Sequence, residues 1–457
     1  MGVRIGIDTG GTFTDLVLMD EATGTVKVVK QPSTPDDPSR AIFQALEKSK
    51  ASSADISGFS LGTTVAVNAL LQRQGARVLY IATEGFQDVP FLQRVDRKFH
   101  YDLDWERPRP LVHRRDCLGV AERVDYQGDI VDPLGAADLD RIITDVRSKL
   151  SDESDEPVAL AINFLFAYAH PEHEQEVRNR LSKEFPDLPI SVSHEVAPIW
   201  REYERASTTI ADAAVKPMMQ AFVKSLDHGL KSRGFERDWA VMKSNGGQML
   251  AEASADRPIQ TVLSGLSGGI IAGKTIGERQ NAHNIITFDM GGTSTDVGVV
   301  ANGSIGYTTA WEIEFGLPIS APFIDLTTMG AGGGSIAWIN KGGMLQVGPQ
   351  SAGADPGPAC YGRGGEYATL TDAFVHLGYI NPNYFLGGFT KLHPDIAKKA
   401  LETHIAGPLG LDATGAAARI VDIMNSRLTG AMRLLSVERG IDPRPFTLVV
   451  GGGAGPL

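Results

Sequence analysis

The stretch Asp8-Thr9-Gly10-Gly11-Thr12-Phe13-Thr14-Asp15 returns later in the chain as Asp289-Met290-Gly291-Gly292-Thr293-Ser294-Thr295-Asp296. Both copies read D-x-G-G-T-x-T-D, and each lies between two apolar runs, which predicts strand, tight glycine turn and strand. Such a turn presents backbone N–H groups and threonine hydroxyls to an anion. One copy alone would be weak support, because glycine-rich β-turns are common. Two copies predict a pair of hairpins that face each other across a cleft and hold a polyphosphate and its metal.

Composition narrows the class of protein. With 457 residues, 42% of them hydrophobic, the chain is long enough for two or more domains with substantial cores. A net charge of −12 without a basic stripe argues against a nucleic-acid-binding surface. Two cysteines, Cys117 and Cys360, cannot build a disulfide framework or a cysteine zinc site. No secretory signal or membrane-spanning apolar stretch is evident, so we expect a soluble cytoplasmic protein without a membrane partner.

The order of apolar runs predicts an α/β architecture. Residues 1–30 read as a β-meander, and the alternation of strands and helices that follows favours one α/β domain over residues 1–196. The segment 201–226 has a long helical pattern interrupted by Pro217, and we interpret it as the hinge into a second domain over residues 197–457.

The second predicted domain contains two further glycine-rich stretches. Residues 325–365 have the composition of a disordered linker, but their short apolar runs favour an ordered, loop-rich lid or cleft wall. A predicted strand over 446–450 runs directly into Gly451-Gly452-Gly453, which is typical of another ligand-binding turn. A helix normally follows such a turn, so we expect the sequence to be part of a longer polypeptide.

Phosphoryl transfer requires positioning and charge neutralisation, and the duplicated stretch supplies both. Asp8 and Asp289 are the predicted catalytic and Mg²⁺-binding residues, with the metal held largely through water; one of them could instead orient a water or a substrate hydroxyl. Asp15 and Asp296 are expected to accept hydrogen bonds from the turns. There is no P-loop and no dinucleotide fingerprint. The predicted phosphate-binding residues are Thr9, Gly10, Gly11, Thr12, Thr14, Gly291, Gly292, Thr293 and Thr295.

Several polar clusters have two interpretations. His170 with the pair His173-Glu174 has near-metal-ligand spacing, but a solvated turn at a helix start is favoured. His194-Glu195, at the end of a predicted strand, has the same two interpretations, and the solvated one is again favoured. The run Arg201, Glu202, Glu204 and Arg205 is interpreted as an exposed helical ion-pair face.

Two residues near the glycine-rich stretch remain ambiguous. Cys360 is either a nucleophile or a small buried residue, and burial is favoured because no partner base can be identified. Asp372 is either a helix cap or a cleft acid.

Beyond the two hairpins, longer stretches match a known family. IDTGGTFTD, LGTTVAVNALL, REYERASTTIADAAVKP, FDMGGTSTDVGVV, MGAGGGSIAWI and VGPQSAGADPGPACYGRGG together resemble the hydantoinase A / 5-oxoprolinase family over nearly the whole chain. SGLSGG, at 264–269, departs from the family, which more often has proline and alanine at 266 and 267.

The resemblance implies a fold. The family is similar to the actin, heat-shock chaperone and sugar kinase superfamily, which implies a two-lobed actin-like ATPase fold of duplicated ribonuclease H-like domains with a nucleotide cleft between the lobes. Residues 8–15 and 289–296 would be the two phosphate motifs, and Gly451 to Gly455 the adenosine motif. The resemblance also adds Gly332 and Gly333 to the nucleotide-binding residues.

The resemblance further implies a reaction that uses ATP and Mg²⁺. A cyclic amide or imide such as a hydantoin, 5-oxoproline or a lactam would be phosphorylated on oxygen, and a hydantoinase B-type partner in a hetero-oligomer would complete ring opening. The alternative is the ATP-dependent activating subunit of an acetone- or acetophenone-type ketone carboxylase. Two other classes are a nucleotide-binding module that only drives domain closure and a degenerate scaffold subunit.

Overall fold

The computed structural model describes residues 2–11, 13–34, 36–151, 156–385, 388 and 390–457. The chain forms two compact units: unit 1 comprises residues 1–267 and 307–323, and unit 2 comprises residues 268–306 and 324–457. The backbone therefore passes from one unit to the other three times. The boundary predicted between residues 196 and 197 falls inside unit 1.

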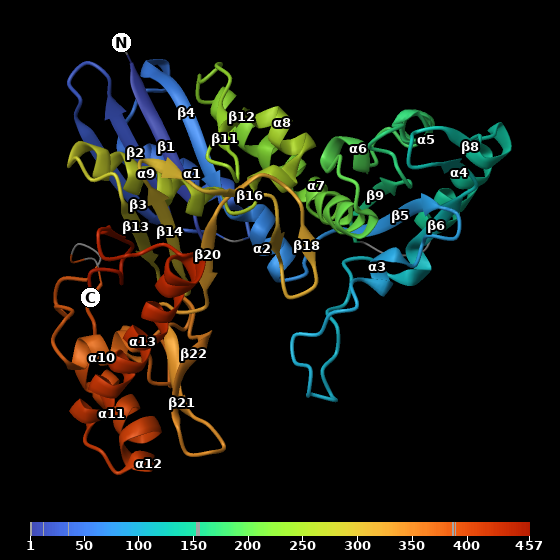
Figure 1. Ribbon diagram of the computed structural model, residues 1–457. Coiled ribbons are helices and arrows are strands. Elements are labelled where there is room, and N and C mark those ends of the chain that lie inside the picture. The colour runs from blue at the N-terminus through green and yellow to red at the C-terminus, as the bar shows by residue number, and fades with distance from the viewer. Residues whose placement is uncertain (1, 12, 35, 152–155, 386–387, 389) are drawn as a thin grey trace. The chain divides into compact units, whose positions relative to one another are not determined.

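The first sheet of unit 1 is built around the first hairpin (Figure 1). Its strand order is β12-β11-β4-β1-β2-β3, in which β1, β2 and β3 form the expected antiparallel meander and β1, β4 and β11 run parallel. α1 covers the meander, and the Asp37 side chain caps it by accepting from the Ser39 N–H. The elements are β1 (Val3–Thr9), β2 (Phe13–Asp20), β3 (Val26–Pro32), α1 (Pro38–Ser49), β4 (Ile56–Thr63), α2 (Val65–Leu71), β11 (Ala240–Met242), β12 (Gln248–Leu250) and α8 (Ala251–Asp256).

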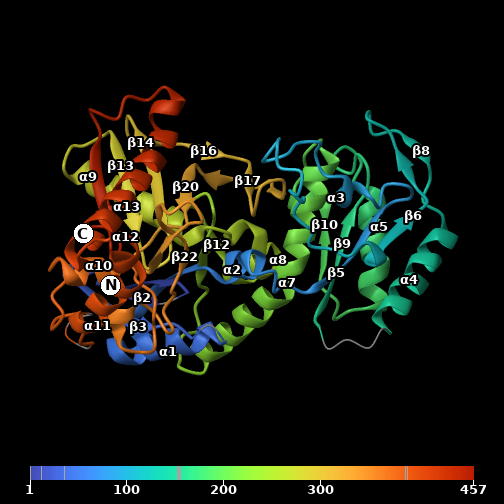
Figure 2. The same ribbon diagram turned by 90° about the horizontal axis from the view of Figure 1, so that it is seen from below.

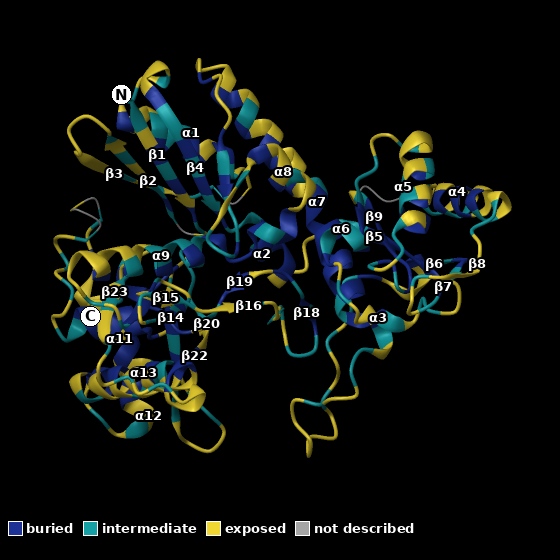
Figure 3. Ribbon diagram, turned by 45° about the horizontal axis from the view of Figure 1, so that its top comes forward, coloured by how far each residue is buried: buried dark blue, intermediate teal, exposed yellow. Residues whose placement is uncertain are grey.

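The second sheet of unit 1 has the order β10-β9-β5-β6, with all neighbours parallel. Its strands are buried on both faces, as Figure 3 shows for β5 and β9, and near-continuous apolar runs are typical of such strands. Its elements are β5 (Arg77–Thr83), α3 (Val89–Leu92), β6 (Cys117–Val120), β7 (Arg123–Val124), β8 (Ile130–Asp132), α4 (Ala136–Leu150), β9 (Val158–Asn163), α5 (Glu172–Glu184), β10 (Ile190–Val192), α6 (Ser193–Val196) and α7 (Glu202–Lys231).

Alternate residues of β5 and β9 face opposite helices. Leu79 and Ile81 pack with α4 and α5, whereas Val78 and Tyr80 pack with α7. Figure 2 shows α7 on one side of β5 and β9, with α4 and α5 on the other. This alternation follows from the two-residue repeat of a strand.

The long helix α7 is continuous, so its interpretation as a hinge was wrong. Pro217 lies inside it and removes one backbone hydrogen bond. Ala213 and Met219, on either side of Pro217, are fully buried, and this packing holds the helix together across the proline. α7 contacts β9 of the second sheet and also α1, α2 and α8, which belong to the first. It is therefore a structural element within unit 1 and not a connection between units.

One segment leaves unit 2, packs on unit 1 and returns; we call residues 307–323 the strap. The Tyr203 hydroxyl of α7 donates to the Gly316 carbonyl, and the Ser320 N–H donates to Thr208 Oγ1 at 2.8 Å. These contacts attach the strap to the first turns of α7. Its strands are β16 (Tyr307–Thr308), β17 (Trp311–Glu312) and β18 (Pro318–Ile319), followed by β19 (Phe323–Ile324) at its end.

Unit 2 is built around the second hairpin. Its main sheet has the order β15-β14-β13-β23, with β20 also paired to β14. α9 covers one face, where Gly273 allows its backbone to approach Thr287: an added Cβ would lie 2.3 Å from Thr287 Cγ2. The glycines of the SGLSGG run at 264–269 lie within this helix. The elements are α9 (Ser264–Arg279), β13 (Ile285–Met290), β14 (Thr295–Ala301), β15 (Ser304–Ile305), β20 (Leu326–Met329) and β23 (Thr447–Gly451).

Helices cover the other face of the unit 2 sheet and form the larger core. Phe288 and Val297 of the hairpin pack there against Ile420 and Met424 of α13. The glycine-rich 325–365 stretch is ordered, and its centre is a β-hairpin. The elements are β21 (Ser335–Ile339), β22 (Leu345–Ser351), α10 (Leu370–His376), α11 (Pro394–Leu401), α12 (Gly407–Leu409) and α13 (Ala413–Leu435).

Across the described parts of the chain, none of the helices combines the length and apolar character needed to cross a bilayer.

Candidate functional site

The first glycine turn is held from behind by a serine. The Gly10 N–H donates to the Phe13 carbonyl at 3.0 Å, which closes the turn between β1 and β2. Ser33 Oγ donates to the Gly10 carbonyl at 2.7 Å and lies 3.0 Å from Thr14 Oγ1. Thr14 is completely buried, so its hydroxyl supports the turn, whereas Gly11 is exposed at its tip.

Asp8 lies at the exposed end of β1, opposite two glycines that the sequence analysis did not select. A Cβ added to Gly62 would lie 3.2 Å from Asp8 Oδ1, and one added to Gly265 would lie 2.8 Å from the same oxygen. Gly62 is also the register partner of Asp8 on β4. The sequence signal was present, because Gly62 ends an apolar strand and Gly265 lies in a glycine-rich run.

The threonines of the first turn differ in their surroundings. The Thr9 carbonyl accepts from the Thr64 N–H at 3.2 Å and from Thr64 Oγ1 at 3.0 Å. Thr9 Oγ1 is buried and has no hydrogen-bond partner among the described residues. A buried hydroxyl in this position is suited to donate to a ligand oxygen. Thr12 lies outside the described residues.

The second turn repeats the first. The Gly291 N–H donates to the Ser294 carbonyl at 3.0 Å, and Asp289 lies at the exposed end of β13, in register with Gly451 on the parallel strand β23. A Cβ on Gly452 would lie 2.4 Å from Asp289 Oδ1, and one on Gly269 would lie 3.6 Å from Oδ2. Within unit 2, the predicted adenosine turn therefore lies directly beside the predicted metal-binding carboxylate.

A third glycine segment packs against the second turn. The Gly333 N–H donates to the Gly291 carbonyl at 3.0 Å, and the Gly334 N–H donates to the Gly292 carbonyl at 2.7 Å. A Cβ on Gly332 would lie 2.6 Å from the Thr293 nitrogen, so no other residue fits there. The structure thus brings together Gly291, Gly292, Thr293, Gly332, Gly333, Gly451 and Gly452 around Asp289.

The buried threonine of the second turn has a structural role. Thr295 Oγ1 donates to the Ala331 carbonyl at 2.5 Å and is fully buried, as Thr14 is in the first turn. On the outer side of the site, a Cβ on Gly292 or Gly453 would meet nothing within 4 Å. These two positions leave space for a ligand to approach the backbone.

The closing aspartates of the two hairpins differ. Asp15 is partly exposed and pairs with Lys30 Nζ at 2.8 Å. Asp296 Oδ1 is buried without a hydrogen-bond partner in the described part of the chain. Burial raises the pKa of Asp296 to about 7, opposed by a hydrogen bond with Thr328 and reinforced by the charge of Asp289. Among the described residues of the two turns, none donates the predicted hydrogen bond to either aspartate.

These turns have the features that a phosphate ligand and its cation require. Glycine backbones can approach phosphate oxygens closely, and an exposed carboxylate at a strand end can hold a hydrated cation. In the described ranges, no three His, Cys, Asp or Glu side chains come together as a metal site. A Mg²⁺ ion at Asp8 or Asp289 would therefore take its remaining ligands from water and phosphate, as Mg²⁺ ordinarily does.

The chain matches the hydantoinase/oxoprolinase model over residues 205–457 and the model of the same family's N-terminal region over residues 4–185. The chain belongs to the hydantoinase/oxoprolinase family.

Among curated relatives of this family member, an uncharacterized protein of Methanocaldococcus jannaschii is 38% identical over 100% of the chain and 68% of its own length. The caprolactamase alpha subunit of Pseudomonas jessenii is 36% identical over 99% of the chain and 65% of its own length. The chain thus spans about two thirds of the length of these relatives.

Two solved structures have the same mixed α/β fold. Acetone carboxylase in its nucleotide-free form matches with a TM-score of 0.84 and 29% identity, over 100% of this chain and 66% of that one. The ATP-dependent caprolactamase of Pseudomonas jessenii matches with a TM-score of 0.82 and 34% identity, over 99% of this chain and 65% of that one.

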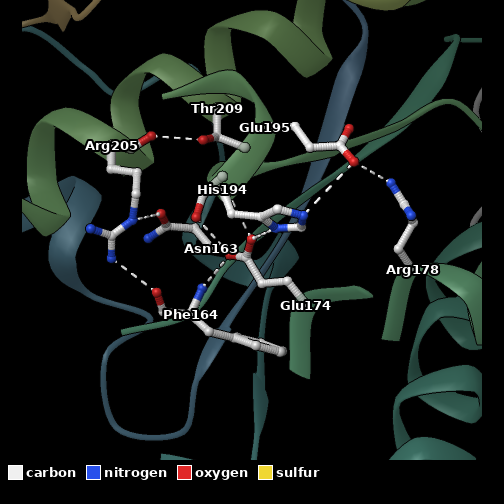
Figure 4. Close-up of polar contacts among 9 residues, drawn as sticks. Asn163, Phe164, Glu174, Arg178, His194, Glu195, Arg205 and Thr209 are labelled. Atoms are coloured by element: carbon white, nitrogen blue, oxygen red, sulfur yellow. Dashed lines mark hydrogen bonds and ion pairs between the residues drawn. The ribbon is translucent and has the colours of Figure 1, made fainter. Parts of the chain in front are cut away.

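The polar clusters that were expected to be solvated turns are instead a buried network in this family member (Figure 4). Glu174 is fully buried and accepts from the Phe164 N–H at 2.8 Å, Ser193 Oγ at 2.6 Å and the His194 N–H at 3.0 Å. His194 Nδ1 lies 2.6 Å from the same carboxylate. Glu174 therefore joins the ends of β9 and β10 to α5.

Arg205 contradicts the expected exposed ion-pair face, because it is almost completely buried. Its guanidinium donates to Asn163 Oδ1 at 3.0 Å and to the Phe164 carbonyl at 2.9 Å (Figure 4). It also donates to the Ile199 carbonyl at 2.7 Å. Burial lowers the pKa of Arg205, with the nearby charge of Glu174 opposing. This side chain fixes the loop after β9 to the first turns of α7.

His173 and Cys360 are also structural. His173 Nδ1 lies 2.8 Å from Glu122 Oε2 in the interior, where burial raises the pKa of Glu122. Cys360 is fully buried, as expected, and burial next to Asp372 raises its pKa. Asp372 is a helix cap: it forms a capping box with Thr369 at the start of α10 and accepts from the Cys360 N–H at 2.7 Å.

Proposed function

We propose that this chain is the ATP-dependent subunit that activates a cyclic amide or imide for hydrolytic ring opening. The observation that carries the proposal is the duplicated arrangement at the two hairpins. In each unit an exposed aspartate ends a strand, a glycine turn connects it to an antiparallel partner, and a glycine on the parallel neighbour lies in register with the aspartate: Gly62 with Asp8 and Gly451 with Asp289.

The same arrangement supports a two-lobed actin-like ATPase fold. In the first sheet of unit 1, the antiparallel hairpin of β1 and β2 lies next to β4, which runs parallel to β1. In the main sheet of unit 2, the hairpin of β13 and β14 lies next to β23, which runs parallel to β13. We propose that each hairpin binds phosphate groups of a nucleotide. The residues in binding roles are Thr9, Gly10 and Gly11 in unit 1 and Gly291, Gly292, Thr293, Gly332, Gly333 and Gly451 to Gly453 in unit 2, with Thr14 and Thr295 fixing the turns.

Asp8 and Asp289 are the proposed Mg²⁺ and catalytic carboxylates. ATP, when bound, supplies the phosphoryl group that turns an amide oxygen into a good leaving group. The protein's own part is positional: the glycine turns orient phosphate oxygens through backbone N–H groups, and the carboxylates hold the cation. Both carboxylates lie near the end of a strand, and glycines that leave room for them lie beside each one.

The relatives support a cyclic amide as the proposed substrate class. The name of the caprolactamase alpha subunit says that it acts on a cyclic amide. The solved caprolactamase from the same organism is an ATP-dependent enzyme. A ketone carboxylase subunit is the second candidate, supported by the structural match to acetone carboxylase, whose carboxylation is ATP-dependent. The caprolactamase relative is named as an alpha subunit, which supports a hetero-oligomer. We propose a hydantoinase B-type partner for the ring-opening step.

Calorimetric titration of ATP with Mg²⁺ into the purified chain tests the nucleotide site. We expect Asp8→Ala and Asp289→Ala each to weaken binding at least tenfold, about 1.4 kcal/mol. Asp187→Ala, a change of an exposed aspartate in the turn after α5, is the matched control and leaves binding unchanged. Wild-type affinity in both site variants would contradict the assignment. The rate of ATP hydrolysis is then measured with an added lactam and, separately, with an added ketone and bicarbonate. The addition that raises the rate separates the two candidate reactions.

A further inference from the structure

A pocket of about 420 Å³ lies in unit 1 beside the first turn of α7. Three segments of unit 1 line it: the chain that follows α3, the start of α7, and the strap at β17 and β18. Pockets of several hundred Å³ are typical of small-molecule sites. Its polar lining residues are Arg94, Asp96, Arg201, Tyr203, Glu204 and Glu312.

The walls of this pocket are fixed by hydrogen bonds. Arg94 and Glu204 form a two-point ion pair, with Arg94 Nε 3.1 Å from Glu204 Oε1. Tyr203 is buried, and its hydroxyl donates to the Gly316 carbonyl of the strap. Glu312 Oε2 accepts from the Gly316 N–H at 3.4 Å. The pocket therefore keeps its shape without a ligand, which lowers the entropic cost of binding.

The pocket presents both donors and acceptors. Since Arg94 and Glu204 satisfy each other, Arg201, Asp96 and Glu312 are the remaining charged groups in its lining. Arg201 is half exposed and lies 3.6 Å from Glu204. Asp96 and Glu312 line the same pocket as Tyr203. Their charges raise the pKa of the Tyr203 phenol, after the larger effects of burial and of Glu204.

A cyclic amide matches this pattern better than a ketone does. The ring holds the amide in the cis form, so that the N–H and the C=O point outward from the same edge of the molecule. A site for this edge needs an acceptor for the N–H beside a donor for the C=O. A guanidinium only donates, and a carboxylate only accepts. A ketone has no N–H, so it offers these carboxylates no hydrogen-bond donor.

We propose that this pocket binds the acceptor substrate as a small cyclic amide or imide, with Arg201 donating to its carbonyl oxygen and Glu312 or Asp96 accepting from its ring N–H. The identity of the bound molecule as a substrate rests on the proposed function. The pocket itself does not depend on the nucleotide site.

The test is calorimetric titration of hydantoin and of ε-caprolactam into the purified chain without nucleotide. We expect Arg201→Gln and Glu312→Gln each to weaken binding by about tenfold or more, because each removes a hydrogen bond to a charged group. Arg115→Gln and Glu236→Gln are the matched controls, since both side chains are exposed away from the pocket lining, and they bind as the wild type does. Thermal unfolding of each variant confirms that it is folded, and Asp96→Asn provides a further variant of the pocket.

The outcomes separate this proposal from the proposed function. Unchanged affinity in the Arg201 and Glu312 variants overturns the pocket assignment, as does failure of both cyclic amides to bind the wild type or preferential binding of acetone or acetophenone. If ATP hydrolysis still rises with a cyclic amide in those variants, the proposed function stands without this pocket. If the cyclic amide binds through Arg201 and Glu312 but ATP does not bind, the pocket stands and the proposed function fails.

Discussion

Replacing Gly452 with alanine is the sharpest test of the glycine turns in unit 2. Gly452 has a φ of +79°, and an added Cβ would lie 2.3 Å from the Met290 carbonyl oxygen and 2.4 Å from Asp289 Oδ1. Two costs add: a left-handed backbone costs an alanine roughly 1–2 kcal/mol, and forcing an extra carbon into packed surroundings typically costs about 1–3 kcal/mol. We expect Gly452→Ala to lower the free energy of unfolding by about 2–5 kcal/mol.

Gly453→Ala is the matched control in the same turn. A Cβ on Gly453 would meet nothing within 4 Å, so we expect no loss of stability from this change. Equilibrium denaturation in guanidinium, followed by circular dichroism and tryptophan fluorescence, measures both variants. Because Gly453 faces open space, its alanine variant should weaken ATP binding while leaving stability unchanged. Equal stability of Gly452→Ala and Gly453→Ala would refute the close packing of this turn against Asp289.

Three further predictions concern groups outside the glycine turns. Burial raises the pKa of Asp212 in the folded protein. As pH rises above about 4, this carboxyl therefore loses its proton in the unfolded chain before it does so in the folded one, and the free energy of unfolding falls. In urea unfolding from pH 4.5 to 8, Asp212→Asn should flatten this decline, and an unchanged slope would contradict the prediction. Arg205→Ala should lower the free energy of unfolding by about 3–5 kcal/mol, because it breaks a buried network. Arg201→Ala should change the free energy of unfolding by less than about 0.5 kcal/mol. Equal losses of unfolding free energy in the two variants would refute this prediction. Burial raises the pKa of Cys117 to about 12 and also raises that of Cys360, so neither thiol should react with a disulfide reagent at pH 8 before denaturant is added, and rapid labelling of the folded protein would contradict their burial.

The hairpins could be predicted because their information is local. Residues 8–15 and 289–296 carry the turn glycines and the flanking apolar runs within one short stretch, and the structure has a strand, turn and strand at both places. The triple glycine after the strand at 446–450 was predicted on the same local grounds, and the turn there packs beside Asp289.

Features that depend on distant residues could not be predicted. The run around Arg205 reads as an exposed charged face, because the acceptors that satisfy its guanidinium come from Asn163 and Phe164, about forty positions earlier. Gly265 lies in a glycine-rich run that marks it as a candidate, but its closeness to Asp8 could not be predicted, because the two residues are far apart in sequence. The predicted boundary at residue 196 failed to allow for β11, which pairs with β4 in the first sheet.

The three crossings of the backbone between the units limit how this protein can be dissected. A single cleavage or truncation cannot yield unit 1 intact, because the strap lies between two parts of unit 2 in the sequence. A stand-alone version of unit 1 would need residues 307–323 joined to its end through an artificial connection, and the corresponding version of unit 2 would need a short bridge in their place. Experiments that assign ligands to one half of the molecule should therefore use point substitutions in the whole chain in preference to deletions.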